Sequence, residues 1–324
     1  MNTMVDTRNT LFSPYRGRIG DLGQRHQSIA PRDLHQGMGV PFVGPCGSPL
    51  QLVTDAATLP ADLQASVMML GSFDGFHRGH QALMAAAQAA ALVVNSPIGV
   101  MSVEPHPRQL FAPQAKAFRL GTPATKAETF GRLGVDFLYS PRFDHAFAGQ
   151  EPEDFIDEIL VGGFKVSRLV VGHNFRFGRQ RRGDVDLLRR LGQQRGFAVT
   201  VVEDVHWDDA TCSSTRVRNL LMSGDIEAAN SLLGHAWSVE LGVEPAAVLR
   251  SGEKIVAWHG SVLKPACGAY DVTVRLPNAS GPLSHGCITI DASGVATLAL
   301  ECWRAIEPGP QAILFVDFIR RRAG

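Results

Sequence analysis

The sequence predicts an α/β fold: a doubly wound five-stranded parallel sheet followed by a small β-barrel-like domain. Through the first two thirds of the chain, short apolar runs alternate with amphipathic helical patterns. Parallel strands need long crossovers, and the helical stretches between the runs are long enough to provide them. After Trp237 the helical patterns stop, and short apolar or alternating segments lie between Gly, Pro, Asn and Ser turns.

The strands of the sheet are predicted at five short apolar runs, residues 66–71, 98–103, 135–140, 167–172 and 197–204. Helices are predicted between and after them, over residues 80–94, 123–134, 152–162, 184–196, 215–222 and 225–233. Asp225 is the expected N-cap of the last of these helices. Ligands of such sheets bind beyond the carboxyl ends of the strands, so we expect the functional site there.

The chain divides into three predicted parts. Residues 1–48 have no helical or strand periodicity and are expected to form a disordered extension. Residues 49–237 hold the sheet domain, and residues 238–324 hold the small β domain. The strands of that second domain are predicted at residues 255–260, 269–276, 287–290, 295–300 and 313–319.

Charge and composition exclude several classes of partner. Thirty-one basic residues balance thirty-one acidic ones, so no global positive field attracts nucleic acid. The longest apolar stretch, residues 82–94, is shorter than the roughly 20 residues that cross a bilayer, so no membrane partner is expected. The five cysteines form no CxxC pair and the N-terminal region has no apolar core, which predicts a cytoplasmic protein.

The segment GSFDGFHRGHQ, residues 71–81, lies between the first predicted strand and the first helix. Gly71 and Gly75 let the backbone approach a phosphate, and a helix that opens at about His80 presents free amides to that anion. His77 and His80, three residues apart, can both donate hydrogen bonds to one phosphoryl group as negative charge builds on it. The segment therefore predicts charge stabilisation without a nucleophile.

A second segment, CSSTRVR, spans residues 212–218 after the last predicted strand of the sheet. Ser213, Ser214 and Thr215 can cap the following helix and donate to phosphate oxygens. Arg218, one turn inside that helix, can act as a clamp on a pyrophosphate. The segment predicts a second anion-binding element of the same domain.

Four motifs in the same order resemble the adenylyltransferase module of bacterial FAD synthetases, the bifunctional riboflavin kinase/FMN adenylyltransferases. They are GSFDGFHRGHQ, EPHP at residues 104–107, GHNFRFG at residues 172–178 and SSTRVR at residues 213–218. The resemblance runs from about residue 50 to about residue 237. Val103 and Gln180 depart from the family, which usually has Phe and a small residue there.

The resemblance implies a Rossmann-like nucleotidyltransferase that converts ATP and FMN to FAD and pyrophosphate. It implies catalytic roles for His77, His80, Ser214, Thr215 and Arg218. It implies ATP binding by Gly71, Phe73, Asp74, Gly75, Gly79 and Ser213. It implies flavin binding by Pro105, His106, Pro107, Asn174, Phe175, Phe177 and Gly178. Mg²⁺ would be held mainly by substrate phosphates, and no protein ligand is named for it.

The residues themselves refine two of these roles. Asn174 can hydrogen-bond with a ring edge or a phosphate. If the chain is extended, Phe175 and Phe177 point to opposite sides, so at most one should face the flavin and the other belongs to the core. His106, between two prolines, either orients its turn or touches the substrate. The cationic run Arg176, Arg179, Arg181 and Arg182 suits phosphates, and a solvated charged face is an equal alternative for Arg181 and Arg182. Lys126, Glu128 and Arg132 are predicted to form an exposed helix face.

The C-terminal domain lacks recognisable kinase motifs. A riboflavin kinase module carries a GRxLGxPTxN segment and a later catalytic Glu, and this chain shows neither. It keeps a GxYxVxV-like strand at residues 268–274 and the ending FVDFIR at residues 315–320. We interpret the domain as a degenerate riboflavin-kinase-like barrel, without kinase activity, that packs on the first domain or mediates association into a homo-oligomer.

Two other functions stay open at this stage. The acceptor of the adenylyl group could be another phosphorylated metabolite, although Asn174 and its neighbouring phenylalanines favour a flavin. The chain could instead be a non-catalytic regulatory protein that binds flavin or nucleotide. Intact His77, His80 and Arg218 argue against that alternative.

Overall fold

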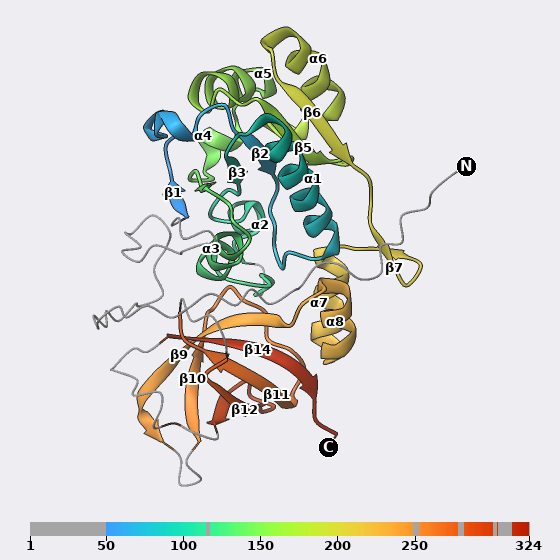
Figure 1. Cartoon of the computed structure of the whole chain (residues 1–324). Helices are drawn as coiled ribbons and strands as arrows, with labels where there is room; N and C mark the ends of the chain where they lie inside the picture. The colour runs from blue at the N-terminus through green and yellow to red at the C-terminus, as the bar shows by residue number, and fades with distance from the viewer. Residues whose placement is uncertain are drawn as a thin grey trace.

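The computed structural model describes residues 50–114, 117–248, 253–277, 282–300, 303 and 313–323. The predicted extension, residues 1–48, lies outside them. The described chain forms an α/β part followed by a β-barrel, which Figure 1 shows stacked one above the other. Within the described residues, none of the helices is long and apolar enough to cross a membrane.

The α/β part is built on a parallel sheet of six strands in the order β1-β4-β3-β2-β5-β6. The five predicted strands are all present, as β2 (Val67–Leu70), β3 (Ile98–Met101), β4 (Phe137–Tyr139), β5 (Arg168–Gly172) and β6 (Ala198–Val202). The sixth strand, β1 (Gln51–Val53), was not predicted. It has three residues and pairs with β4 alone at the sheet edge, so it carries almost no apolar signal.

Helices cover both faces of the sheet, which confirms the doubly wound prediction. On β2, Met68 and Leu70 face one core cluster while Val67 and Met69 face another, as the two-residue period of a strand requires. The described helices are α1 (Arg78–Val94), α2 (Pro107–Phe111), α3 (Pro123–Arg132), α4 (His145–Ala148), α5 (Pro152–Asp154), the π-helix η3 (Phe155–Gly163), α6 (Val185–Arg195), α7 (Ser214–Ser223) and α8 (Ile226–Leu233), with 3-10 turns η1 (Ala56–Thr58), η2 (Ala61–Leu63) and η4 (Arg179–Arg181).

The C-terminal part is a closed antiparallel barrel in the order β10-β13-β12-β11-β14-β9. Its strands are β9 (Trp237–Val248), β10 (Lys254–Trp258), β11 (Gly268–Arg275), β12 (Ser284–Ile290), β13 (Ala296–Leu300) and β14 (Ile313–Arg321). The prediction missed β9, in which Pro245 and small residues hide the strand pattern. A two-stranded hairpin, β7 (His206–Trp207) and β8 (Ala210–Thr211), precedes α7.

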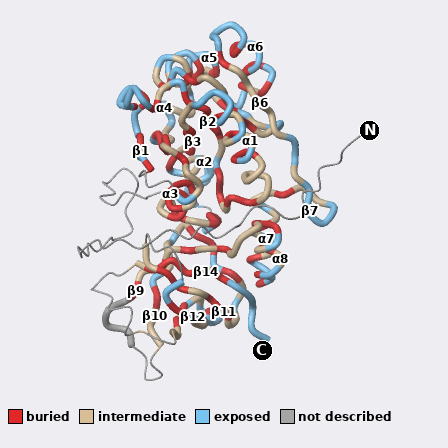
Figure 2. The backbone as a smooth tube through the Cα atoms, viewed as in Figure 1, coloured by how far each residue is buried: buried red, intermediate tan, exposed pale blue. Residues whose placement is uncertain are grey.

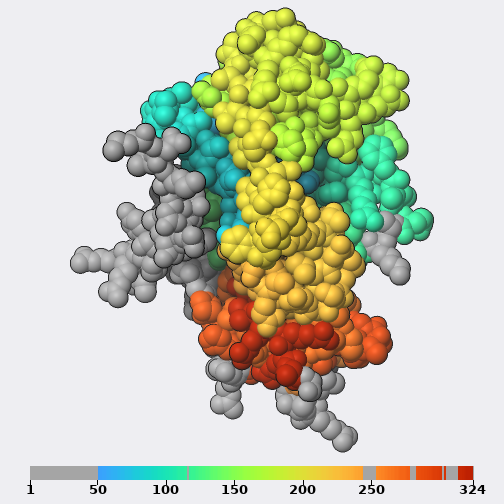
Figure 3. Space-filling model, turned by 90° about the vertical axis from the view of Figure 1, so that its right-hand side faces the viewer, coloured from blue at the N-terminus to red at the C-terminus, as the bar shows by residue number. Residues whose placement is uncertain are grey.

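The barrel core continues into the first part of the chain. Trp237, Tyr270 and Phe318 share one buried cluster with Leu221 of α7 and Leu232 of α8. Figure 3 shows these two helices, in gold, between the sheet domain and the orange-red barrel. Buried residues therefore occupy both parts and also their junction (Figure 2).

Candidate active site

A cleft of about 830 Å³ lies at the carboxyl ends of β2, β3, β5 and β6. The predicted site residues that line it are Gly71, Phe73, His77, Gly79, His80, His106, Pro107, Asn174, Phe175, Phe177, Gly178, Ser213 and Ser214. The cleft does not include five others in its lining, namely Asp74, Gly75, Pro105, Thr215 and Arg218. Motifs that are far apart in the sequence thus share one cavity at the expected edge of the sheet.

The two histidines of the first motif lie face to face at the N-terminus of α1. Their ring centroids are 3.8 Å apart and the rings are tilted by 20°. Helix α1 begins two residues earlier than predicted, at Arg78, because the His77 ring caps it: His77 Nδ1 accepts a hydrogen bond from Gly79 N at 3.2 Å. A Cβ on Gly79 would lie 3.1 Å from that ring, so glycine makes the room for this cap.

Both histidines are neutral near pH 7. Burial lowers the pKa of His77 to about 4, and burial together with neighbouring His77 and Lys126 holds the pKa of His80 well below its usual value. Because His77 Nδ1 accepts from Gly79, the proton of that ring is on Nε2. His80 Nδ1 is buried and has no hydrogen-bond partner among the described residues. The pair is therefore arranged to donate from neutral rings.

Asp74 and Arg218 lie beneath the cleft and bind each other. Arg218 Nη2 donates to Asp74 Oδ2 at 2.5 Å, and Arg218 Nε donates to the carbonyl of Phe118 at 2.7 Å. The other Asp74 oxygen accepts from Leu120 N at 2.9 Å. The Asp74 side chain is 4% exposed and that of Arg218 15%. Arg218 thus holds the turn at residues 71–77 in place through Asp74, and Arg218 itself does not line the cleft.

The second motif is tied directly to the first. Ser213 caps α7 by accepting from Arg216 N at 3.2 Å, as predicted. Ser214 Oγ donates to the main-chain oxygen of Asp74 at 2.7 Å, across 140 residues of sequence. The hydroxyls of residues 213–214 and the two histidines therefore flank the same part of the cleft.

The structure confirms that His106 orients its own turn, whereas its contact with a substrate stays a prediction. It caps α2 through Nδ1, which accepts from Arg108 N at 3.1 Å, and its ring also lines the cleft. The edge of the ring meets Phe118 at a centroid distance of 5.0 Å. Burial lowers the pKa of His106 to about 4, so this ring is also neutral.

The expectation that Phe175 and Phe177 point apart is wrong. Residues 173–174 form a turn rather than a strand, and the two rings stack with centroids 5.7 Å apart and an angle of 16°. Both rings line the cleft, and Phe177 also belongs to a buried core cluster. The loop therefore offers a stacked aromatic pair, together with Asn174, on one wall of the cleft.

Most of the predicted cationic run is neutralised within the protein. Arg176 pairs with Asp184 at 2.8 Å, and both Arg179 and Arg182 pair with Glu151. Arg181 has no acidic partner in the described part of the chain, and it lines the cleft. Of the four arginines, Arg181 is thus the one without an acidic partner among the described residues, and it is exposed.

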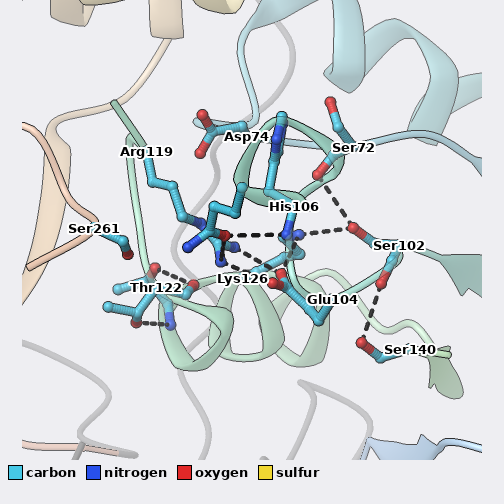
Figure 4. Close-up of polar contacts among 12 residues, drawn as sticks. Ser72, Asp74, Ser102, Glu104, His106, Arg119, Thr122, Lys126, Ser140 and Ser261 are labelled. Carbon is cyan, nitrogen blue, oxygen red and sulfur yellow. Dashed lines mark hydrogen bonds and ion pairs between the residues drawn. The ribbon is translucent and has the colours of Figure 1, made fainter. Parts of the chain in front are cut away.

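Three buried charges behind the cleft were missed by sequence reasoning. Glu104 accepts from Arg119 Nη2 at 2.6 Å and from Lys126 Nζ at 3.0 Å (Figure 4). Lys126 Nζ also donates to Ser102 Oγ at 2.7 Å, and Ser102 Oγ donates to Ser72 O in the phosphate-binding turn at 3.1 Å. Although burial raises the Glu104 pKa, Lys126 and Arg119 lower it to about 2.

Helix α3 therefore does not present the exposed charged face that was predicted. Lys126 is 9% exposed and Glu128 4%, and only Arg132 reaches solvent, with 44% of its side chain exposed. Glu128 is covered because Arg275 of the barrel pairs with it. The available signal was the apolar neighbours Ala127 and Phe130, both fully buried, which place much of this helix inside the protein.

The sequence matches the FAD synthetase family model over residues 59–216. A bifunctional riboflavin kinase/FMN adenylyltransferase from Pseudomonas fluorescens is 35% identical, over 72% of this chain and 76% of that protein. The chain belongs to the FAD synthetase family, which is a family of nucleotidyltransferases. A protein of the same description from Escherichia coli (strain K12) is 37% identical, over 55% of this chain and 57% of its own length.

The fold of this family member also occurs in a solved structure. The crystal structure of a macrolide-efflux protein from Streptococcus pneumoniae aligns with a TM-score of 0.70 at 21% identity. The alignment covers 85% of this chain and 91% of that one. At this level of identity the likeness concerns the fold alone.

Replacing Glu104 by Gln tests the buried charge cluster. The change leaves Arg119 and Lys126 as uncompensated buried cations, so the free energy of unfolding should fall by about 3–5 kcal/mol. Urea denaturation of the purified protein measures this loss. Glu153→Gln is the control, because Glu153 is exposed and its replacement should stay within about 0.5 kcal/mol. Equal losses in the two variants would contradict the assignment.

Because His77 is buried in its neutral form, the free energy of unfolding should depend on pH. The unfolded chain protonates this histidine near pH 6.5, whereas the folded protein does so only at about pH 4. The unfolded state therefore binds more protons between these values, so the contribution of neutral His77 to stability should fall by up to about 3 kcal/mol as the pH drops through this window, in addition to the losses from buried His80 and His106. In His77→Asn, which keeps a capping oxygen, the fall in stability should be smaller. Urea titrations of both proteins over this pH range measure the two curves of stability against pH, and coinciding curves would refute the claim.

Proposed function

We propose that this chain transfers the adenylyl group of ATP to FMN, which gives FAD and pyrophosphate. The observation that carries the proposal is the stacked His77–His80 pair at the start of α1, in one cleft with the aromatic loop at Phe175 and Phe177. ATP is assigned to the wall formed by residues 71–80 and 213–214, and the flavin to the wall formed by residues 106–107 and 174–178. Membership of the FAD synthetase family supports both assignments.

The reaction requires one bond to form and one to break. An oxygen of the FMN phosphate attacks the α-phosphorus of ATP, and the bond from that phosphorus to the bridging oxygen of the β-phosphate breaks, so that pyrophosphate leaves. Negative charge grows on the α-phosphoryl oxygens during this step. His77 Nε2–H, the N–H of His80 and the N-terminal amides of α1 face that charge, and no covalent enzyme intermediate is needed.

Neutral histidines suit this task. A donor that is already neutral in the resting protein needs no proton uptake before ATP binds, and burial makes its hydrogen bond stronger than it would be in water. Phe73 and Phe76 hold the His80 ring at centroid distances of 5.2 Å and 6.2 Å. The donors are thus fixed before the substrate arrives, which is the condition for electrostatic catalysis.

Mg²⁺ is proposed to reach the site with the nucleotide. Among the described residues, no three His, Cys, Asp or Glu side chains come together as a ligand set. Asp74, the one carboxylate of the motif at residues 71–81, already accepts hydrogen bonds from Arg218 and Leu120 N. Phosphate oxygens of the substrates would therefore hold the ion, which neutralises part of their charge when bound.

We further propose that the barrel has no riboflavin kinase activity, since neither kinase motif is recognisable in residues 238–324. FMN must then be supplied by another enzyme. A cytoplasmic location is part of the proposal: Cys212, Cys267 and Cys287, the cysteines that the structure describes, are free thiols.

Flavin products should distinguish the two activities. Purified protein with ATP and Mg²⁺ is expected to convert FMN to FAD and to leave riboflavin unchanged, with flavins separated by chromatography. Formation of FMN from riboflavin at a rate comparable to FAD formation would overturn the absence of kinase activity. Failure to form FAD from FMN would overturn the main proposal.

Removal of the His80 ring should slow the reaction without unfolding the protein. His80→Ala is expected to lower kcat by on the order of a hundredfold or more, because a fixed donor to developing charge contributes about 3–4 kcal/mol. His145→Ala is the control, since His145 is an exposed histidine of α4 that does not line the cleft. Steady-state rates and melting curves are compared, and an unchanged kcat in folded His80→Ala would remove this residue from the mechanism.

A further inference from the structure

The short segment of residues 117–122 contacts both the barrel and the proposed adenylyl-transfer site. Building on the proposed function, we propose that the barrel is a positioning element for this site and that Trp237 is a positioning residue. The segment runs between α2 and α3 and has no helix or extended strand among its described residues. Its shape is therefore set by its hydrogen-bond partners, which come from the barrel on one side and from the site on the other.

Backbone hydrogen bonds join the segment to the barrel. Phe118 N and Arg119 N both donate to the main-chain oxygen of Ser261, at 3.1 Å and 3.0 Å. Leu263 N donates back to Arg119 O at 2.9 Å. Figure 4 shows Ser261 beside the Arg119 backbone. This pairing fixes both ends of the Arg119 residue, whose side chain reaches Glu104 in the buried charge cluster.

One side chain of the barrel completes the attachment. Trp237 Nε1 donates to Leu120 O at 2.8 Å, in a buried contact across 117 residues of sequence. Trp237 is 1% exposed and packs against Phe318 of β14 at a centroid distance of 4.8 Å. The position of Leu120 therefore depends on where the barrel core holds the Trp237 indole.

The other side of the segment belongs to the site. Leu120 N donates to Asp74 Oδ1, and Phe118 O accepts from Arg218 Nε. Because both N–H and C=O of Leu120 are used, a shift of Leu120 that follows loss of the Trp237 bond also displaces Asp74. Asp74 belongs to the same turn as Gly71 and His77, so such a shift changes the position of the proposed donors.

A second connection runs parallel to the first. Thr122, the N-cap of α3, donates from Oγ1 to Glu240 of β9 at 2.6 Å. Six residues after Thr122, within α3, Glu128 pairs with Arg275 of the barrel. The barrel thus holds both the segment and the start of the helix that carries Lys126, the partner of Glu104.

The test uses two Trp→Phe variants of the full-length protein. Trp237→Phe removes the N–H that reaches Leu120 and keeps an aromatic ring. Trp258→Phe is the matched control. The ring centroids of Trp258 and Trp237 are 6.2 Å apart, and Trp258 also contacts Phe318. The Nε1 atom of Trp258 is buried without a partner in the described residues. At a temperature where both are folded, Trp237→Phe should lower kcat for FAD formation by on the order of tenfold, with the KM for FMN unchanged, and Trp258→Phe by less than about twofold.

A double-mutant cycle separates positioning from general destabilisation. If Trp237 acts through Leu120 and Asp74, the loss caused by Trp237→Phe should disappear when Asp74 is already replaced by Ala, which removes the acceptor of Leu120 N. Amide exchange over residues 117–122 should also be faster in Trp237→Phe than in Trp258→Phe, whether or not FAD is formed. Equal kcat values in the two Trp variants, full additivity in the cycle, or unchanged exchange would each overturn the proposal.

Two further comparisons keep the outcome decisive. If Trp237→Phe does not fold, benzothienylalanine at position 237 replaces the N–H by sulfur in a ring system of nearly the same shape, and the same outcomes are expected. If the wild-type protein forms no FAD, the proposed function fails, and the exchange measurement still tests the barrel contact.

Discussion

The buried carboxylate of Asp74 is the interaction on which the rest of the site depends. It accepts from Arg218 of α7 and from Leu120 N, and its own main-chain oxygen accepts from Ser214. These three partners come from two other regions of the chain, so one side chain brings three segments together beneath the phosphate-binding turn. Removal of the carboxylate would leave a largely buried Arg218 without its charge partner, which is a destabilising change.

A second group of buried charges lies near the place where the substrate phosphates are proposed to bind. Glu104, Arg119 and Lys126 give a cluster with one more positive than negative charge, and Ser102 links it to the turn at Ser72. Buried ion pairs of this kind contribute little net stability, because desolvation offsets their attraction. What they supply is a rigid backing and a positive potential behind the place where the phosphates are proposed to bind.

The predictable features were those that depend on local pattern. Five sheet strands, most helix positions and the caps at Ser213 and Asp225 follow from apolar periodicity and side-chain oxygen placement. Strand β1 was missed because a three-residue edge strand has no period. The burial of Lys126 was missed because its charge partner, Glu104, lies 22 residues earlier in the sequence, so the local run of charges did not show the pairing.

The loop with Phe175 and Phe177 shows the same limit from another direction. The expectation that the two rings lie on opposite faces depends on an extended backbone. The backbone forms a turn at residues 173–174, so this condition is not met. Likewise, the sequence allowed Arg218 to reach a pyrophosphate, whereas the structure aims it at Asp74 and Phe118. Motif letters locate the site, but the partners of each side chain come from tertiary contacts.

These contacts also give a physical reason for a barrel that lacks kinase motifs. Helix α7 begins within the second motif, residues 212–218, and the buried faces of α7 and α8 pack into the same cluster as Trp237 and Phe318. Without the barrel, that apolar surface and the carbonyl of Leu120 would be left without partners. The need to cover this surface does not depend on whether the barrel has kinase activity. The barrel therefore remains part of the structural unit that builds the cleft.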